Sequence, residues 1–311
     1  MSSKGTTQVR GEKIWMDGQL VAWDDATVHV LTHTLHYGLG VFEGIRCYRT
    51  ADGRSAVFRL AEHVKRLLES AHINLMKVPF TQAQLEEGVV ETLRANGLAE
   101  GYIRPLVFIG HGAMGLNPGD NPVRVSIAAW PWGKYLGDEG MERGIRAKIS
   151  TFARHHVNAK MTKGKTCGDY VNSILAKREA LLDGYDEAIL LDTQGLVAEA
   201  SGENLFLVRG GVLRTPSLPT VLGGITREAV LALAHDKGIP VQEGGVTRDE
   251  LYIADEVFLT GTAAEVTPIR EIDHRQIGEG RRGPVTKTLQ TAFFDAVTGK
   301  DPKHQPWLRY L

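Results

Sequence analysis

Apolar residues follow a helical spacing in several segments of the chain. Between residues 60 and 76 they form one stripe, which comprises Val64, Leu67, Leu68, Ala71 and Leu75. Thr81, three positions before Gln84, is typical of a helix N-terminus, and this second helix is expected to end near Asn96-Gly97. The pattern predicts three further helices, at 170–182, 226–237 and 285–297.

Short runs of apolar, β-branched and aromatic residues predict strands between these helices. Residues 12–23 are expected to form a hairpin closed by Asp17-Gly18, a dipeptide that tolerates positive φ. Four closely spaced strands between residues 188 and 215 suggest a barrel or a meander. The predicted strands after the hairpin are 56–59, 102–108, 123–130, 188–192, 196–200, 204–208, 212–215, a segment around Val241, and 257–260.

The length of 311 residues exceeds the size at which one hydrophobic core usually stops growing, so we expect two domains. The stretch 131–140 is rich in glycine and charge and lacks periodicity, which favours an interdomain segment. We predict a small N-terminal α/β domain over 1–132, an interdomain loop over 133–142 and a larger domain over 143–311. The fold class is therefore α/β (α+β).

Composition and charge narrow the class of function. The chain is 42% hydrophobic and 23% charged and has no run of 18 apolar residues, so a membrane span is not expected. A net charge of -1 lacks the one-sided field that nucleic-acid binding needs, which favours a small-molecule substrate. The first residues resemble no targeting signal, so we expect a cytoplasmic protein. Cys47 and Cys167 fit neither a disulfide framework nor a zinc site, and no metal is expected.

One segment has the pattern of an anion-binding helix end. In LGGIT (222–226) two glycines lead into a helix, so the backbone amides of Ile225 and Thr226 would point outward from its N-terminus. Arg59, after a strand, and Thr262, in a glycine-flanked turn, are candidates for additional phosphate contacts. Locally, a plain turn and a solvated surface arginine fit these residues at least as well.

Three lysines are candidates for a nucleophilic amine. Lys160, Lys163 and Lys165 lie in a polar stretch whose simplest interpretation is a solvated loop, and the local pattern does not choose among them. Glu199 follows an apolar strand, where a carboxylate is ordinarily expected at the rim of a sheet.

Seven motifs occur in a fixed order along nearly the whole chain. They are HYGLGVFEGIR (36–46), YIRPL (102–106), AMGLNP (113–118), KTCGDY (165–170), EASGENLF (199–206), GGITR (223–227) and GTAAEVTP (261–268). With them the chain resembles the branched-chain aminotransferases, which are pyridoxal-phosphate enzymes of fold type IV. The resemblance implies a small α/β domain, a larger β-barrel-like domain with helices, and a homodimer or higher homo-oligomer.

The resemblance also implies roles for individual residues. The family's catalytic Schiff-base lysine falls on Lys165, which is followed five positions later by Tyr170. Tyr170 would contact the phenolic oxygen of pyridoxal 5'-phosphate, and Glu199 would contact its ring nitrogen. Arg59, Ile225, Thr226 and Thr262 would form the phosphate cup. The implied cofactor-binding residues are Arg59, Lys165, Tyr170, Glu199, Gly224, Ile225, Thr226, Gly261 and Thr262.

The implied reaction moves the amino group of L-leucine, L-isoleucine or L-valine to 2-oxoglutarate in two half-reactions, with Lys165 as both tether and proton base. Met114 and Leu116 would reach the site of a neighbouring subunit. The implied substrate-binding residues are Tyr37, Phe42, Gly44, Tyr102, Arg104, Met114, Leu116, Trp132, Thr262 and Ala263.

Two alternatives stay open from the sequence. An (R)-amine or D-amino acid transaminase of the same fold would share the lysine, the glutamate and the phosphate cup, but the intact Tyr102-x-Arg104 pair argues against it. A non-catalytic protein of the same fold would be expected to lose the lysine, whereas Lys165, Tyr170 and Glu199 are all retained.

Overall fold

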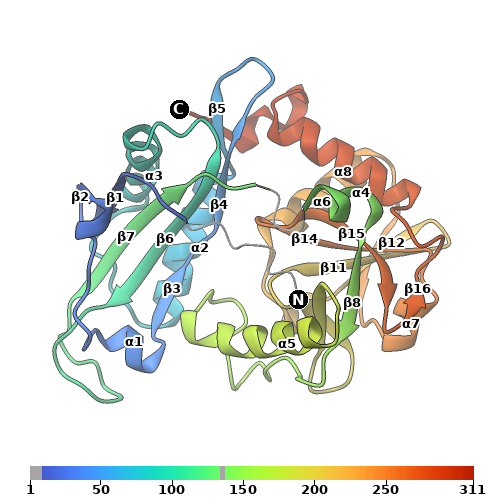
Figure 1. Ribbon diagram of the computed structural model, residues 1–311, viewed down its shortest axis with the longest axis horizontal. Helices are drawn as coiled ribbons and strands as arrows, with labels where there is room; N and C mark the ends of the chain where they lie inside the picture. The colour runs from blue at the N-terminus through green and yellow to red at the C-terminus, as the bar shows by residue number, and fades with distance from the viewer. Residues whose placement is uncertain (1–8, 134–136) are drawn as a thin grey trace. The chain divides into compact units, whose positions relative to one another are not determined.

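The computed structural model describes residues 9–133 and 137–311, which form two compact units (Figure 1). The first unit runs to Gly133 and includes Pro306–Leu311, and the second ends at Gln305. The sequence predicts instead that this C-terminal segment is part of the larger domain, over 143–311. The segment belongs to the first unit because β17 (Leu308–Tyr310) pairs antiparallel with β5 (Ser55–Phe58), a backbone interaction that three residues of sequence do not reveal.

The first unit is a sheet covered on one face by two helices. Besides β5 and β17, its elements are β1 (Lys13–Met16), β2 (Gln19–Ala22), α1 (His33–Tyr37), β3 (Gly40–Phe42), β4 (Ile45–Arg49), α2 (Leu60–Ile73), α3 (Gln82–Ala95), β6 (Gly101–Ile109) and β7 (Val123–Trp130). The strands pair in the order β17-β5-β4-β6-β7-β1-β2, and β3 pairs with β6. The apolar stripes of α2 and α3 share one hydrophobic core with this sheet.

Local signals in the first unit are confirmed, with one correction. The hairpin turns at Asp17-Gly18, both with positive φ, and Thr81 forms a capping box with Gln84. Helix α2, however, ends at Ile73 instead of residue 76, and Leu75 is 90% exposed. The reason is a Schellman motif: Leu75 takes a left-handed conformation and the Met76 amide returns to the Ala71 carbonyl at 2.9 Å. Met76 is buried where Leu75 was expected.

The second unit is built on one curled sheet. Its elements are α4 (Gly137–Arg143), β8 (Ile145–Ile149), α5 (Tyr170–Leu182), β9 (Glu187–Leu191), β10 (Val197–Ala200), β11 (Asn204–Arg209), β12 (Val212–Pro216), α6 (Ile225–Asp236), β13 (Val241–Gly244), α7 (Arg248–Tyr252), β14 (Glu256–Gly261), β15 (Glu265–Ile272), β16 (Arg275–Gln276) and α8 (Pro284–Val297). The pairing order is β10-β9-β8-β15-β14-β11-β12-β13, with β16 beside β15.

A simple meander is excluded because β11 pairs with β14, from much later in the chain, and β8 pairs in parallel with both β9 and β15. The two ends of the sheet approach each other, since the Val197 amide of β10 donates to the Val246 carbonyl just after β13 at 2.8 Å. The barrel-like expectation therefore describes this unit better than the meander.

The expected interdomain loop at 133–142 includes a helix, α4, while residues 134–136 lie outside the described part of the chain. Met141 of α4 is buried, and its carbonyl accepts a hydrogen bond from the Gln290 side chain of α8 at 3.1 Å. These contacts place α4 in the second unit. No described helix has the length and apolar character needed to cross a membrane.

Helix α5 turns its small residues inward and its large apolar residues outward. Its buried residues are Ser173, Ala176 and Ala180, and the two alanines pack in a cluster with Ala188 and Leu190 of β9. Its exposed large apolar residues are 43–83% accessible and comprise Val171, Ile174, Leu175, Leu181 and Leu182. This reverses the usual amphipathic order of a surface helix and leaves an apolar face on the unit.

Candidate functional site

The loop before α5 carries the three candidate lysines, and the structure separates them by their partners. The Lys165 ammonium donates to the Tyr170 hydroxyl at 2.6 Å. Lys160 forms an ion pair with Asp169 at 3.8 Å, and burial lowers the pKa of Lys160. Lys163 donates to two backbone carbonyls of the loop that precedes α6. Of the three contacts, only that of Lys165 pairs an amine with a phenol.

One short turn brings Lys165 to Tyr170. A 3-10 helix (Cys167–Asp169) separates the two residues, and α5 begins at Tyr170 itself. Both side chains are partly buried. The five-residue spacing seen in the sequence thus becomes a direct contact between an amine and a hydroxyl, which restricts the orientation of the amine.

Glu199, on β10, is a buried carboxylate and not a rim group. It is 5% exposed. Its Oε1 atom pairs with Arg154 Nη2 at 2.7 Å, and its Oε2 atom accepts from the Leu222 amide at 3.2 Å and from Asn204 Nδ2 at 3.4 Å. Burying a carboxylate is costly unless it is paired and hydrogen-bonded, so these donors explain how it is accommodated.

Sequence reasoning missed two of these partners, Arg154 and Asn204. Arg154 follows β8, and its guanidinium also donates to Ser173 of α5 at 3.0 Å. Asn204 opens β11, and its side-chain amide also donates to the Leu222 carbonyl at 2.9 Å. Asn204 lies within the EASGENLF motif and could have been singled out there, whereas Arg154 lies in a segment with no local signal.

Helix α6 begins at Ile225, directly after Gly224, and no side chain caps its N-terminus in the described structure. The first backbone amides of a helix have no partner within the helix, so this end favours an anion. Gly224 is required by packing: a Cβ atom there would lie 1.9 Å from the Asn204 Oδ1 atom. Asn204 therefore contacts the Glu199 carboxylate and also packs against Gly224 at the N-terminus of α6.

The segment after β14 carries the other predicted phosphate contacts. Gly261 closes β14, and the partly buried Thr262 and Ala263 form the turn into β15. The hydroxyl of Thr260, the residue before Gly261, is buried without a hydrogen-bond partner among the described residues.

In the first unit, five predicted substrate residues form one cluster, with Tyr102 at its centre. A Cβ atom on Gly44 would lie 1.9 Å from the Tyr102 hydroxyl. Arg104 donates to that hydroxyl at 3.4 Å, and its guanidinium lies 4.8 Å from the centre of the Phe42 ring. The Trp132 ring packs 5.0 Å from the Tyr102 ring. The cluster combines apolar rings with one cationic group.

The remaining predicted substrate residues of the first unit lie on exposed segments. Tyr37 is the last residue of α1, and Met114 and Leu116 lie in the loop between β6 and β7, with exposures of 43%, 41% and 91%. His33 of α1 bonds to the Gly115 carbonyl at 2.8 Å and so ties this loop to α1. An apolar side chain as exposed as Leu116 suits a contact with another molecule.

Arg59 is a buried residue, so its interpretation as a solvated surface arginine is wrong. It precedes α2 in a left-handed conformation and is 7% exposed. Its side chain pairs with Glu62 at 2.5 Å and lies 5.3 Å from the centre of the Trp307 ring. Its cationic group is therefore held in place by the first unit.

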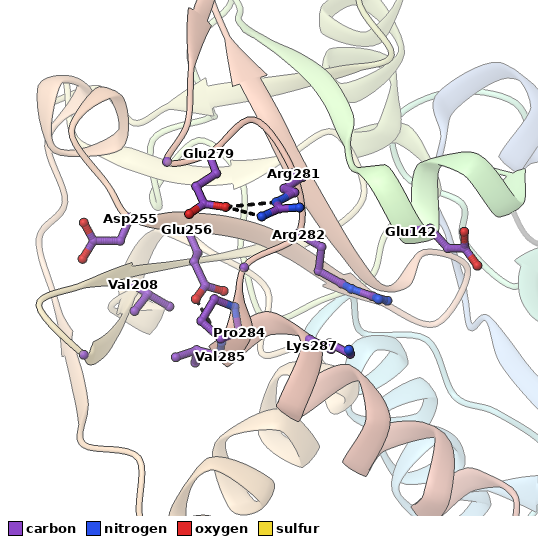
Figure 2. Close-up of a pocket in the computed structure, with 13 residues that line it drawn as sticks. Glu142, Val208, Asp255, Glu256, Glu279, Arg281, Arg282, Pro284, Val285 and Lys287 are labelled. Atoms are coloured by element: carbon purple, nitrogen blue, oxygen red, sulfur yellow. Dashed lines mark hydrogen bonds and ion pairs between the residues drawn. The ribbon is translucent and has the colours of Figure 1, made fainter.

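A cavity of about 740 Å³ in the second unit contains none of the predicted site residues (Figure 2). Glu256 in its wall accepts from the amides of Val285 and Thr286 at 2.9 and 2.7 Å and so caps α8. Arg281 and Glu279 form an exposed ion pair at 2.6 Å, visible in Figure 2. Glu256 therefore caps a helix, and Arg281 and Glu279 form a surface ion pair, so these charged residues of the cavity have structural partners.

The chain matches the family described as amino-transferase class IV over residues 40–272. It belongs to the class IV aminotransferases. This aminotransferase is 54% identical to the branched-chain-amino-acid aminotransferase of Pseudomonas aeruginosa over 294 residues, which cover 94% of this chain and 95% of that protein.

Solved structures extend this likeness to three dimensions. The branched-chain amino acid aminotransferase of Escherichia coli is similar with a TM-score of 0.94 and 47% identity, over 96% of this chain and 99% of that chain. The holo-form of the Thermobaculum terrenum enzyme, solved in its PLP-form, gives a TM-score of 0.92 and 34% identity, over 97% of this chain and 99% of that chain. The family and the fold expected from the motifs are thereby confirmed.

Proposed function

We propose that this class IV aminotransferase uses pyridoxal 5'-phosphate to move the amino group of L-leucine, L-isoleucine or L-valine to 2-oxoglutarate, which gives the 2-oxo acid and L-glutamate. The observation that carries the proposal is the 2.6 Å contact between Lys165 and Tyr170 in the unit that also holds the buried Glu199 carboxylate. The branched-chain relatives, similar over nearly the whole chain, support the substrate class.

The second unit fits this cofactor on chemical grounds. An uncapped helix end at Gly224 suits a phosphate, and Ile225, Thr226, Gly261 and Thr262 would contribute to its binding. The buried Glu199 suits a protonated ring nitrogen. Within residues 9–133 and 137–311, no group of three or more His, Cys, Asp or Glu side chains could hold a metal ion.

Each residue then has a defined task. When bound, the cofactor supplies an electron sink for negative charge at the substrate Cα atom. Lys165 would tether the cofactor and, once released, carry the proton from the substrate Cα atom to the C4′ carbon of the cofactor, with Tyr170 orienting its amine. Glu199 would keep the ring nitrogen protonated, and Arg154 and Asn204 would orient Glu199.

The cluster around Tyr102 would serve two kinds of substrate. Arg104 and Tyr102 would position carboxylates, including the second one of glutamate, while Phe42 and Trp132 would contact an aliphatic side chain. The intact Tyr102-x-Arg104 pair supports L-amino acids with 2-oxoglutarate over (R)-amines or D-amino acids as the substrates.

The absorption spectrum of the purified protein tests this function. L-Leucine should bleach the cofactor band near the edge of the visible range, and 2-oxoglutarate should restore it. A band that ignores L-leucine but bleaches with an (R)-amine or a D-amino acid would move the protein to that alternative. Absence of any band after addition of pyridoxal phosphate would contradict the cofactor assignment.

The proposal includes a homodimer or a higher homo-oligomer. It is supported by the exposed apolar face of α5 and by the 91% exposure of Leu116 in a loop expected to reach a neighbouring subunit. A cytoplasmic location is also part of the proposal and rests on the sequence, and cell fractionation would test it.

A further inference from the structure

A buried ion cluster lies next in sequence to the predicted substrate residues of the first unit. Glu43, between β3 and β4, is fully buried. Its carboxylate accepts from Arg66 Nε at 2.6 Å and from Arg66 Nη2 at 2.9 Å, and it lies 2.8 Å from His63 Nδ1. Burial raises the pKa of Glu43, but the Arg66 charge and the His63 hydrogen bond outweigh it and hold the pKa well below its ordinary value.

This cluster joins a strand corner to a helix. His63 and Arg66 lie on α2, whereas Glu43 stands between Phe42 and Gly44 at the corner from β3 into β4. The Glu43 amide donates to the Pro105 carbonyl of β6 at 2.9 Å, and the Gly44 amide lies 3.3 Å from the Glu43 carboxylate. The corner is therefore held by backbone on one side and by the side chains of Arg66 and His63 on the other.

The contacts of the corner leave little room for displacement. Gly44 approaches the Tyr102 hydroxyl so closely that a methyl group would not fit. The Phe42 ring lies against the Arg104 guanidinium, at 4.8 Å from its centre. A shift of the corner would move both groups relative to Tyr102 and Arg104, which carry the predicted contacts with substrate carboxylates.

The cluster also differs from an ordinary surface ion pair. On the same helix, Lys65 and Glu69 lie 3.7 Å apart with 68% and 58% of their side chains exposed, and such pairs contribute little. Glu43 and His63 are excluded from water, and removal of one member leaves the others buried without a full set of partners.

We propose that Glu43, held by Arg66 and His63, is a positioning residue for substrate binding: it sets the 42–44 corner so that Phe42 and Gly44 keep their places at Tyr102 and Arg104. The proposal rests on the proposed function, because it takes this cluster as the substrate-binding surface. Being fully buried, Glu43 acts through the corner and does not contact the substrate.

Glu43→Gln tests this role, because it keeps the shape of the side chain and removes its charge. We expect KM for L-leucine and for 2-oxoglutarate to rise about tenfold while kcat changes much less. The cofactor band and its intensity per subunit should equal those of the wild type. Arg66→Lys retains the charge but loses the two-pronged contact, so its KM should rise by a smaller factor. Glu69→Gln, an exposed change on the same helix, is the control and should leave both KM values unchanged.

Wild-type KM values in a folded Glu43→Gln protein would overturn the proposal, as would a fall in kcat with KM unchanged. If Glu43→Gln does not fold, Arg66→Lys decides by the same criteria. Failure of the wild type to react with L-leucine would refute the proposed function instead. The KM comparison would then use whichever amine bleaches the cofactor band.

Discussion

Lys165 differs from Lys160 and Lys163 in the group that its side-chain nitrogen contacts. Lys160 faces a carboxylate and Lys163 faces backbone carbonyls, whereas the amine of Lys165 is held at the Tyr170 hydroxyl. A group that must change partners during a reaction is better served by a hydroxyl than by an ion pair, because less electrostatic energy is lost when the contact opens.

Lys165→Ala should lower the rate of transamination by at least about 10⁴-fold, since both the covalent tether and the proton base are removed. Turnover of L-leucine with 2-oxoglutarate measures the loss, and the absorption spectrum should lose the band of the lysine-bound cofactor. Lys163→Ala is the matched comparison and should keep that band. Wild-type turnover in Lys165→Ala would disprove the catalytic assignment.

Glu203 makes stability depend on pH. Burial, and to a lesser degree the charge of Glu187, raises the pKa of Glu203 from 4.5 to about 8. The folded protein therefore holds a proton that the unfolded chain releases, so the stabilisation is complete below pH 4.5 and is lost as the pH rises through about 8.

Glu203→Gln should remove this contribution to the pH dependence. The free energy of unfolding of the variant, relative to the wild type, should increase steadily between about pH 5 and about pH 8 and then level off. Urea unfolding midpoints over this range measure the difference. A constant difference across the range would show that Glu203 is ionised in the folded protein.

At the scale of elements, several predicted cofactor-binding residues lie at the ends of helices: Tyr170 begins α5, and Gly224 and Ile225 begin α6. The entry into α6 combines an uncapped N-terminus with a glycine that packs against Asn204, and Asn204 in turn contacts Glu199. One junction therefore supports both the predicted phosphate contact and the predicted ring contact.

Gly224→Ala should weaken cofactor binding strongly, because its Cβ atom would displace Asn204 from Glu199 and from the Leu222 carbonyl. Gly223→Ala is the neighbouring comparison: a Cβ atom there would meet nothing within 4 Å, so the loss should be smaller. Titration of the cofactor-free proteins with pyridoxal phosphate gives both affinities. Equal affinities for the two variants would refute this account of Gly224.

At the scale of the whole molecule, the outward face of α5 is the strongest sign of self-association. Its five large apolar residues are 43–83% exposed, while the small residues of the same helix face the core. A second copy of the chain that covers this face would bury apolar area that a single chain leaves in water.

Ile174→Lys should shift the protein toward the monomer, because it places a charge in the middle of this face. Ile253→Lys is the control, since Ile253 is equally accessible, at 57% against 53% for Ile174, but lies outside α5. Sedimentation velocity over a range of protein concentrations distinguishes the two. An unchanged oligomer in Ile174→Lys would show that the interface lies elsewhere.

Local patterns predicted most elements of this protein, since hydrophobic period, capping residues and turn dipeptides act within a few positions. The start of α3 at Thr81 and the span of α5 are both confirmed. The same reasoning failed at Leu75. The left-handed position of this Schellman motif is occupied by leucine, so the sequence lacks the glycine that usually indicates the end of a helix.

The sequence by itself determined the periodicity of the elements, the absence of a strong net charge and the ordered motifs that identify the family. The tertiary structure decided which charged groups meet: Arg66 with Glu43, 23 positions apart, and Arg154 with Glu199. It also decided that the C-terminal strand joins the first unit. The physical reason is range, because periodicity arises between near neighbours in the chain, whereas a buried charge or a strand edge finds its partner only after distant segments have packed.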